Sequence, residues 1–259
     1  MNQSNEPLLE VHDVRLRFGG VVALDGPSFT VDRGQICGLI GPNGAGKTTL
    51  FNCISRVYEP DSGEIRFGGE DLLRKRVEDI PAIGIARTFQ NLGLFGSMSV
   101  LENVMVGGHH RTNRGYLSTV LGLPGGRREE RCERESARAV LADLGLESVS
   151  DELVGGLPFG TLKRVELARA LMADPRLLLL DEPANGLNHT EVGELAETIR
   201  RVRDDRGLTI LLVEHHMGMV MSISDSVVVL NFGRVVADGA PQAVRNDPQV
   251  IEAYLGGAA

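Results

Sequence analysis

The sequence contains no tryptophan, and aromatic residues make up only 4% of its 259 residues. Its three cysteines, Cys37, Cys53 and Cys132, are too few for a disulfide framework, and neither Cys-x-x-Cys nor His-Glu-x-x-His occurs to indicate zinc. No apolar run approaches the ~18–20 residues that span a bilayer. The first ten residues lack the charged and then apolar segments of a signal peptide. We therefore expect neither a secreted nor an integral membrane protein.

Basic residues are also scarce, since 27 Lys and Arg stand against 35 Asp and Glu and give a formal net charge of −8. Such a chain lacks the general basic surface typical of nucleic-acid binding, so we expect no nucleic-acid partner. The remaining composition, 42% apolar and 24% charged, is ordinary for a globular protein. The length is sufficient for a sizeable core, and we expect residues 1–259 to form a single domain.

Short apolar runs alternate with helical patterns in the last third of the chain. The runs predict strands at 177–180, 209–213 and 226–230, and helices are expected at about 189–205 and 240–255. Strands separated by helices favour a parallel sheet that helices cover on both faces.

The earlier parts of the chain follow different patterns. Residues 8–40 nearly alternate apolar and polar residues around glycine turns, which predicts β-structure. Residues 91–170 are predicted to be mainly helical, with an Arg- and Glu-rich helix at 127–146 whose charges form i,i+4 pairs. The glycines of 107–126 indicate a loop-rich insertion. The predicted fold is α/β, with a mostly parallel core sheet, an N-terminal antiparallel β subdomain and a helical subdomain inserted at about 91–170.

Residues 41–48 match the phosphate-binding pattern G-x-x-x-x-G-K-[ST] in full, and they lie between a predicted strand and a predicted helix. Glycines let backbone N–H groups turn toward crowded phosphates, and the helix N-terminus adds its positive dipole. Lys47 suits the β- and γ-phosphates, and the Thr48 hydroxyl suits Mg²⁺. The residues expected to bind a nucleoside triphosphate here are Gly41, Pro42, Asn43, Gly44, Ala45, Gly46, Lys47, Thr48 and Thr49.

Two adjacent acids, Asp181 and Glu182, follow the apolar strand predicted at 177–180. Unpaired buried carboxylates are costly, so acids at such a place indicate a function. Asp181 is expected to hold Mg²⁺, as the acidic part of a site that contains a phosphate loop. Glu182 is expected to polarise the attacking water as a general base.

These residues resemble the ATP-binding subunits of ABC transporters, and the resemblance covers nearly the whole chain. Residues 87–91, Arg-Thr-Phe-Gln-Asn, are similar to the Q-loop, which implies that Gln90 contacts Mg²⁺ or water and senses the membrane partner. Residues 185–188 are similar to the D-loop, which implies that Asn188 contributes to nucleotide binding. The resemblance also assigns contact with the γ-phosphate to His215, and stacking on adenine to Phe18.

The segment at the family's signature position departs from the common Leu-Ser-Gly-Gly-Gln, because it reads Leu-Pro-Phe-Gly-Thr at 157–161. Proline has neither a hydroxyl nor an N–H for a phosphate, but Gly160 and the first amides of the next helix remain. The resemblance implies that four residues contact the ATP of an opposing subunit, namely Pro158, Phe159, Gly160 and Thr161. A Leu-Pro-aromatic-Gly signature resembles one branch of the family, the ATPases of branched-chain amino-acid importers. The segments at 18–20, 86–91 and 246–256, and the long insertion after 102–104, agree with that branch.

The resemblance implies an ATPase that uses ATP and Mg²⁺ to drive a membrane importer from the cytoplasmic face of the cell membrane. The implied partners are transmembrane permease subunits and a second ATP-binding subunit, identical or similar, in a head-to-tail dimer. A periplasmic or extracellular binding protein would act indirectly. Branched-chain amino acids as cargo follow only from the resemblance, and urea or short-chain amides remain open.

Other readings of the chain are less well supported. A soluble ABC-type ATPase that acts on ribosomes or DNA usually has tandem nucleotide domains, whereas this chain has one phosphate loop. A GTPase would carry Asn-Lys-x-Asp, which does not occur, and a small-molecule kinase has no use for a signature segment. The pairs His109-His110 and His215-His216 offer metal ligands, but adjacent residues of a strand point to opposite faces. We therefore expect no metal site at either pair, with His109 and His110 at the surface.

Overall fold

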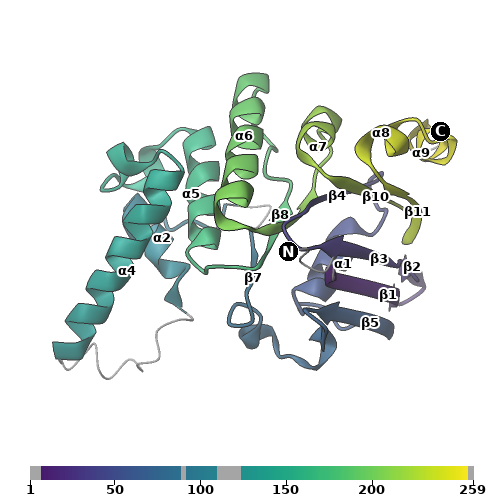
Figure 1. Ribbon diagram of the computed structural model, residues 1–259, viewed down its shortest axis with the longest axis horizontal. Coiled ribbons are helices and arrows are strands. Elements are labelled where there is room, and N and C mark those ends of the chain that lie inside the picture. The colour runs from purple at the N-terminus through teal and green to yellow at the C-terminus, as the bar shows by residue number, and fades with distance from the viewer. Residues whose placement is uncertain (1–6, 89–91, 110–123, 256–259) are drawn as a thin grey trace, which may run out of the picture.

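The computed structural model describes residues 7–88, 92–109 and 124–255, which form two sheets and the helices around them (Figure 1). The strands of the central sheet are β4 (Ile36–Ile40), β7 (Ile85–Arg87), β8 (Leu177–Asp181), β9 (Thr209–Val213), β10 (Ser226–Asn231) and β11 (Arg234–Gly239). Their order is β11-β10-β4-β9-β8-β7, and every neighbouring pair except β10 with β11 is parallel. The predicted parallel core is confirmed.

The second sheet is antiparallel and comes from the N-terminal part of the chain. Its strands are β1 (Pro7–Phe18), β2 (Val21–Asp25), β3 (Phe29–Asp32), β5 (Ser62–Phe67) and β6 (Glu70–Asp71). The long strand β1 pairs with β2, β3 and β5. The predicted β subdomain is therefore present.

Helices pack on both faces of the central sheet. The longer ones are α1 (Lys47–Ile54), α2 (Val100–Val106), α4 (Pro124–Asp143), α5 (Phe159–Leu171), α6 (His189–Arg206), α7 (Met217–Ile223), α8 (Pro241–Arg245) and α9 (Pro248–Leu255), and short 3-10 helices cover 72–74, 77–79, 147–149 and 154–156. Figure 1 shows α2, α4 and α5 together at one end of the molecule, and α8 and α9 at the other. The expected fold, with its inserted helices, is thus found.

The alternation along β8 places this strand between two hydrophobic clusters. Leu177 and Leu179 belong to the cluster shared with α1 and the antiparallel sheet, whereas Leu178 and Leu180 belong to the cluster shared with α5 and α6. A strand that is apolar on both faces is typical of a buried parallel sheet. The central sheet is therefore covered on both sides, as the sequence predicts.

Two local predictions need correction, and a third is confirmed. Residues 124–126 begin α4 and do not belong to a loop, and 110–123 of the expected insertion lie outside the described residues. The single helix expected at 240–255 is divided into α8 and α9, because a residue that precedes proline, here Asp247, disfavours the helical conformation. The charged face of α4 does form the expected i,i+4 pairs, Arg131 with Glu135 and Arg134 with Glu130.

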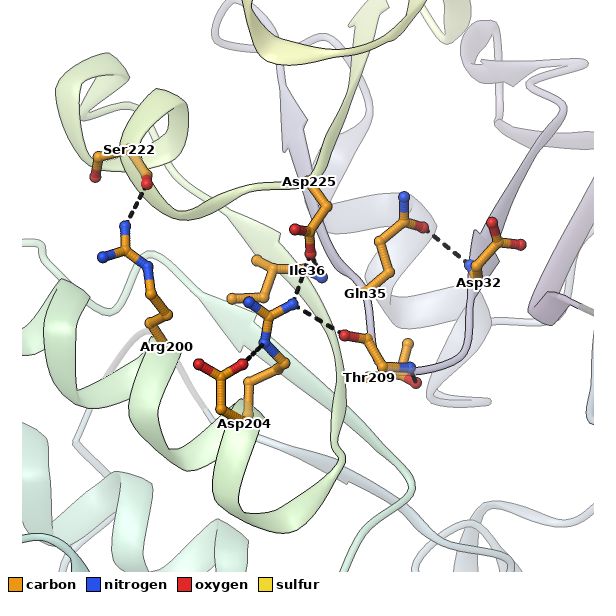
Figure 2. Close-up of polar contacts among 10 residues, drawn as sticks. Asp32, Gln35, Ile36, Arg200, Asp204, Thr209, Ser222 and Asp225 are labelled. Carbon is orange, nitrogen blue, oxygen red and sulfur yellow. Dashed lines mark hydrogen bonds and ion pairs between the residues drawn. The ribbon is translucent and has the colours of Figure 1, made fainter. Parts of the chain in front are cut away.

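Polar contacts join the N-terminal ends of β4, β9 and β10 (Figure 2). The phosphate loop follows the opposite, C-terminal end of β4. The Ile36 N–H and the Arg203 guanidinium both donate to Asp225 Oδ2, each at 2.8 Å. Arg203 also donates to Gly34 O at 3.0 Å, and the Gly34 N–H donates to Thr209 Oγ1 at 2.9 Å. These contacts fix the N-terminal ends of the strands. The candidate site lies at their C-terminal ends.

Among the residues that the structure describes, no helix has the length and apolar character needed to cross a bilayer.

Candidate active site

The segment 41–46 connects β4 to α1 and adopts backbone conformations that require glycine. Gly41, Gly44 and Gly46 have φ angles of 151°, 80° and 99°. A Cβ at Gly41 would lie 2.1 Å from Leu230 O, and one at Gly46 would lie 2.5 Å from Ala23 O. The loop is therefore packed against its surroundings, and it leads directly into the helix N-terminus at Lys47. This is the geometry that the phosphate-binding pattern predicts.

The Lys47 side chain is buried and turned back onto the loop. Its Nζ donates to Gly41 O at 2.7 Å and to Pro42 O at 2.9 Å. Burial lowers the pKa of Lys47, while the neighbouring carboxylates of Glu182 and Asp181 raise it. The register of the sheet agrees with this, because Leu39 of β4 and Asp181 of β8 both lie opposite Val213 of β9, so the loop lysine and the acid pair follow the same ends of nearby strands.

Asp181 is the last residue of β8, and its carboxylate is buried in an ion pair. Arg87, at the end of the neighbouring strand β7, places its NH2 2.8 Å from Asp181 Oδ2. The same guanidinium donates through NH1 to Asn52 at 2.7 Å and to Ser55 at 3.0 Å. Arg87 therefore connects the acid to α1, a role that the sequence reasoning missed.

Glu182 follows Asp181 with a φ of 48°, which is unusual for a residue other than glycine. Its N–H donates to Val213 O at the end of β9, at 2.8 Å. A strained backbone held by surrounding contacts is common at functional sites. The conformation turns Glu182 out of the line of the strand, so that it is only partly buried while Asp181 is almost fully buried.

Glu214, directly after β9, connects the acid segment to the two histidines. It is buried, and Oε1 accepts the N–H of Ala184 at 2.7 Å. Its Oε2 accepts the N–H groups of His215 at 3.0 Å and His216 at 3.2 Å. Sequence reasoning assigned no role to Glu214, although an acid after a buried strand was a signal that could have identified it.

The expected divergence of His215 and His216 is wrong. They follow β9 instead of lying within it, and their ring centroids are 4.7 Å apart with an angle of 32° between the planes. Their ligand atoms and those of Glu214 lie within 4.8 Å of one another. Both oxygens of Glu214 already accept backbone N–H groups, so this carboxylate is engaged in holding the segment. His215 itself is exposed beside the acid pair's loop, and His109 is exposed as expected.

Phe18 ends β1 and is 47% exposed. Tyr58 contacts it edge to face, with a centroid distance of 5.3 Å and an interplanar angle of 70°. The exposed ring is a surface on which an adenine base can stack, and Tyr58 supports it. Tyr58 was not identified from the sequence.

The signature residues lie at the start of α5, where Pro158 is the N-cap. Phe159 is exposed, and its ring packs against the D-loop, since a Cβ at Gly186 would lie 2.8 Å from Phe159 Cε1. A cavity of about 70 Å³ borders Pro158, Gly160 and Thr161 on the side of α6. The helix N-terminus expected at this segment is therefore present and open to a partner.

Asn188 and Gln90 were also predicted to belong to the site. Asn188 is the N-cap of α6, and its Oδ1 accepts from the N–H groups of Thr190 and Glu191, both at 3.0 Å. Any contact of Asn188 with a nucleotide would therefore use the side-chain amide nitrogen. Gln90 lies outside the described residues.

The family model described as ABC transporter matches residues 24–185, which include the phosphate loop, the signature segment and the acid pair. The chain belongs to the ABC transporter family. A second family model, described as branched-chain amino acid ATP-binding cassette transporter, matches residues 234–259. The chain is thus an ATP-binding subunit of this family, whose ATPase activity is coupled to transport.

Known relatives align over nearly the whole chain. The high-affinity branched-chain amino acid transport ATP-binding protein BraF of Pseudomonas aeruginosa is 43% identical over 252 residues, 97% of this chain and 99% of BraF. The Escherichia coli protein of the same description, LivG, is 41% identical over 252 residues, with the same shares covered.

Solved structures agree with this assignment. The ADP conformation of MJ1267, an ATP-binding cassette of an ABC transporter, superposes with a TM-score of 0.84 at 31% identity, over 97% of this chain and 99% of that one. A nucleotide-free ATP-binding cassette gives a TM-score of 0.82 at 31% identity, over 96% and 99%. The family therefore binds ATP with this fold.

Proposed function

We propose that this chain is the ATPase of an importer for branched-chain amino acids and acts at the cytoplasmic face of the cell membrane. The cargo is supported by the family model matched at 234–259 and by the names of the relatives. The observation that carries the ATPase site is the register of the central sheet, in which Leu39 and Asp181 both lie opposite Val213, so that the phosphate loop and the acid pair follow neighbouring strand ends. Its partners would be permease subunits and a second ATP-binding subunit, and a binding protein would act indirectly.

In the proposed site, residues 41–49 surround the phosphates, and Phe18 stacks on adenine. Lys47 would exchange the carbonyl oxygens of Gly41 and Pro42 for phosphate oxygens, because a phosphate is the stronger partner for an ammonium group. The lysine is thus held close to its position of use before the nucleotide arrives. Preorganisation of this kind lowers the cost of binding.

The oxygen donors near the loop fit a magnesium ion. Mg²⁺ prefers carboxylate and hydroxyl oxygens together with substrate phosphates, which Asp181 and Thr48 offer here. A carboxylate has about four lone-pair directions, so the pair with Arg87 at Oδ2 leaves Asp181 further acceptor capacity. Asp181, Thr48 and Gln90 would hold the ion, which when bound neutralises charge that develops on the phosphates.

We assign the hydrolytic step to Glu182, which would take a proton from the attacking water as general base. His215 would contact the γ-phosphate, and Gln90 would touch the ion or the water. Glu214 positions both sides of this arrangement, because its carboxylate holds the backbone of Ala184 and of His215. The second subunit would complete the site with Pro158, Phe159, Gly160 and Thr161, together with Asn188, in a head-to-tail dimer.

Uptake into vesicles tests the proposal. Vesicles that contain this chain and the permease subunits that co-purify with it are loaded with Mg-ATP, and labelled leucine, urea and acetamide are supplied outside with the purified binding protein. We expect ATP-dependent uptake of leucine by the wild type and none with Lys47→Ala, which removes the cation of the phosphate loop. Uptake of urea or acetamide instead of leucine would overturn the cargo, and equal uptake with Lys47→Ala would overturn the site.

A further inference from the structure

The aromatic residue of the signature segment contacts the D-loop of its own subunit. Phe159 is the first residue of α5, at a position where the common signature has glycine. It is 44% exposed, yet its ring lies against Gly186, since a Cβ at Gly186 would be 2.8 Å from Phe159 Cε1 and 3.3 Å from Cζ. Gly186 has a φ of 84°, a conformation that favours glycine. The ring therefore occupies the space that a side chain at 186 would need.

A second contact joins the same two parts of the chain. A Cβ at Gly160 would lie 2.8 Å from Oε1 of Glu191, which belongs to the first turn of α6. The other oxygen of Glu191, Oε2, accepts the N–H of Asn188 at 2.9 Å, so this side chain is held as part of the cap of α6. The start of α5 thus contacts the D-loop and the start of α6 through two neighbouring residues.

Lys163, one helical turn after Phe159, is buried beside the same ring. The residue is 4% exposed, and its Nζ lies over the Phe159 ring at 5.6 Å from the centroid. Within residues 7–88, 92–109 and 124–255, Lys163 forms no hydrogen bond or ion pair. A buried charge without a partner is costly, and the face of an aromatic ring within about 6 Å attracts an ammonium group. The Phe159 ring is therefore the partner that compensates this charge.

We propose that Lys163 and Phe159 form a clamp, in which the buried ammonium group fixes the ring and the ring fixes the D-loop at Gly186. The signature segment and the D-loop then face the opposing subunit as one surface. Lys163 is a positioning residue, because it is buried and acts through Phe159. This inference rests on the proposed head-to-tail dimer, and it gives the aromatic residue a task that the glycine of the common signature cannot perform.

The test removes the cation and keeps the ring. In a Glu182→Gln background, where ATP should persist because the proposed general base is lost, light scattering measures the Kd of the ATP-dependent dimer. We expect Lys163→Met to raise this Kd about 5- to 30-fold, as for the loss of a partly desolvated cation–π contact. Lys163→Arg keeps a cation that stacks on aromatic rings, so it should retain the Kd of the parent. Lys75→Met, the same chemical change at a lysine paired with Glu70, is the matched control and should leave the Kd unchanged.

A ring variant shows whether Lys163 acts through Phe159. In a Phe159→Leu background, Lys163→Met should change the dimer Kd no further, because the ring through which it acts is gone. The affinity for ADP, measured by calorimetry, should be the same for Lys163→Met as for the parent, since the phosphate loop is untouched. The urea midpoint of Lys163→Met should not be lower than that of the parent.

Contrary results are equally definite. The clamp is overturned if Lys163→Met leaves the dimer Kd unchanged, weakens the dimer equally in the Phe159→Leu background, or is matched by Lys163→Arg. A weaker dimer accompanied by a lower urea midpoint or by a loss of ADP affinity also overturns it. If the Glu182→Gln parent forms no dimer with ATP, alone or mixed with its second ATP-binding subunit, the proposed head-to-tail site fails and the clamp fails with it. If the parent dimerises and Lys163→Met does so equally well, only the clamp fails.

Discussion

The carboxylate of Asp181 is held by a residue 94 positions away in the chain, Arg87. The side chains of this pair are 11% and 3% exposed, so little water screens them. A buried ion pair is stable only when its remaining hydrogen-bonding groups are satisfied, and Asn52 and Ser55 contribute to this for Arg87. Asp181, the acid that we propose as a magnesium ligand, is therefore held in a fixed place by a cation that itself contacts α1.

We expect Arg87→Ala to lower the free energy of unfolding by about 3–5 kcal/mol, because removal of one partner leaves a buried charge uncompensated. Urea denaturation without nucleotide measures the change. The same substitution in an Asp181→Asn background should cost clearly less, because no carboxylate is then left unpaired. Equal costs in the two backgrounds would show that Arg87 stabilises the fold through its other contacts and not through Asp181.

The sequence alone could assign a residue whose partners are close to it in the chain. It could not assign one whose partners are distant in the chain. The phosphate loop and the acid pair are contiguous in the chain, and they follow strands that an apolar run reveals. The contact of Arg87 with Asp181 exists only because β7 pairs with β8, with Arg87 opposite Leu179. A strand of three residues such as β7 has too short a pattern to predict, so neither its pairing nor the ion pair was accessible.

At the scale of elements, the sequence predicts the long apolar strands well and the short or irregular elements poorly. The strands β8, β9 and β10 were predicted to within a residue, because their apolar runs are uninterrupted. No prediction was made for α7 or β11, which have seven and six residues and depend on packing against the C-terminal helices. Local sequence carries little information about elements that tertiary contacts stabilise.

The contacts at the start of β4 predict a change in stability without a change in the site. Asp225→Ala would leave the buried Ile36 N–H without its acceptor, so we expect a loss of about 1–3 kcal/mol in the free energy of unfolding. The matched control is Asp204→Ala, since Asp204 pairs with the same Arg203 at 2.6 Å but is 58% exposed. A surface pair of this kind contributes about 0–1 kcal/mol.

The affinity for ATP should be unchanged in both variants, because the five residues of β4, at about 3.3 Å each, separate Asp225 from Gly41 by about 17 Å. Urea denaturation gives the stabilities and calorimetry gives the affinities. Weaker binding of ATP by Asp225→Ala would mean that contacts at the N-terminal ends of the strands affect the nucleotide site at their C-terminal ends.

At the scale of the whole molecule, the residues of the proposed site lie in two different parts of the fold. The phosphate loop and the acids lie at the carboxyl edge of the central sheet, whereas the signature residues begin α5 in the helical part (Figure 1). Pro158 and Phe159 are exposed there, so their surface is open to another subunit. This arrangement supports a site that only two chains complete, with ATP between them.

Glu182→Gln should separate hydrolysis from binding and so make that dimer visible. The substitution keeps the size of the side chain and leaves Lys47, Thr48 and Asp181 in place, so ATP affinity should be retained. Hydrolysis should fall by a factor on the order of 10² or more, as expected for the loss of a general base. ATP that persists between two subunits then stabilises their association by mass action, because it binds the dimer better than the monomer.

Gel filtration with light scattering, with and without Mg-ATP, measures the mass of Glu182→Gln, and an assay of released phosphate measures its rate. We expect a dimer that forms only with ATP. The double variant Lys47→Ala, Glu182→Gln is the control, and it should remain monomeric because the loop no longer holds the phosphates. Full hydrolysis by Glu182→Gln would refute the general-base role. If Glu182→Gln stays monomeric with ATP, a dimer of two identical subunits is contradicted. The partner would then be a similar but different subunit, and the same measurement on a mixture of the two subunits tests this.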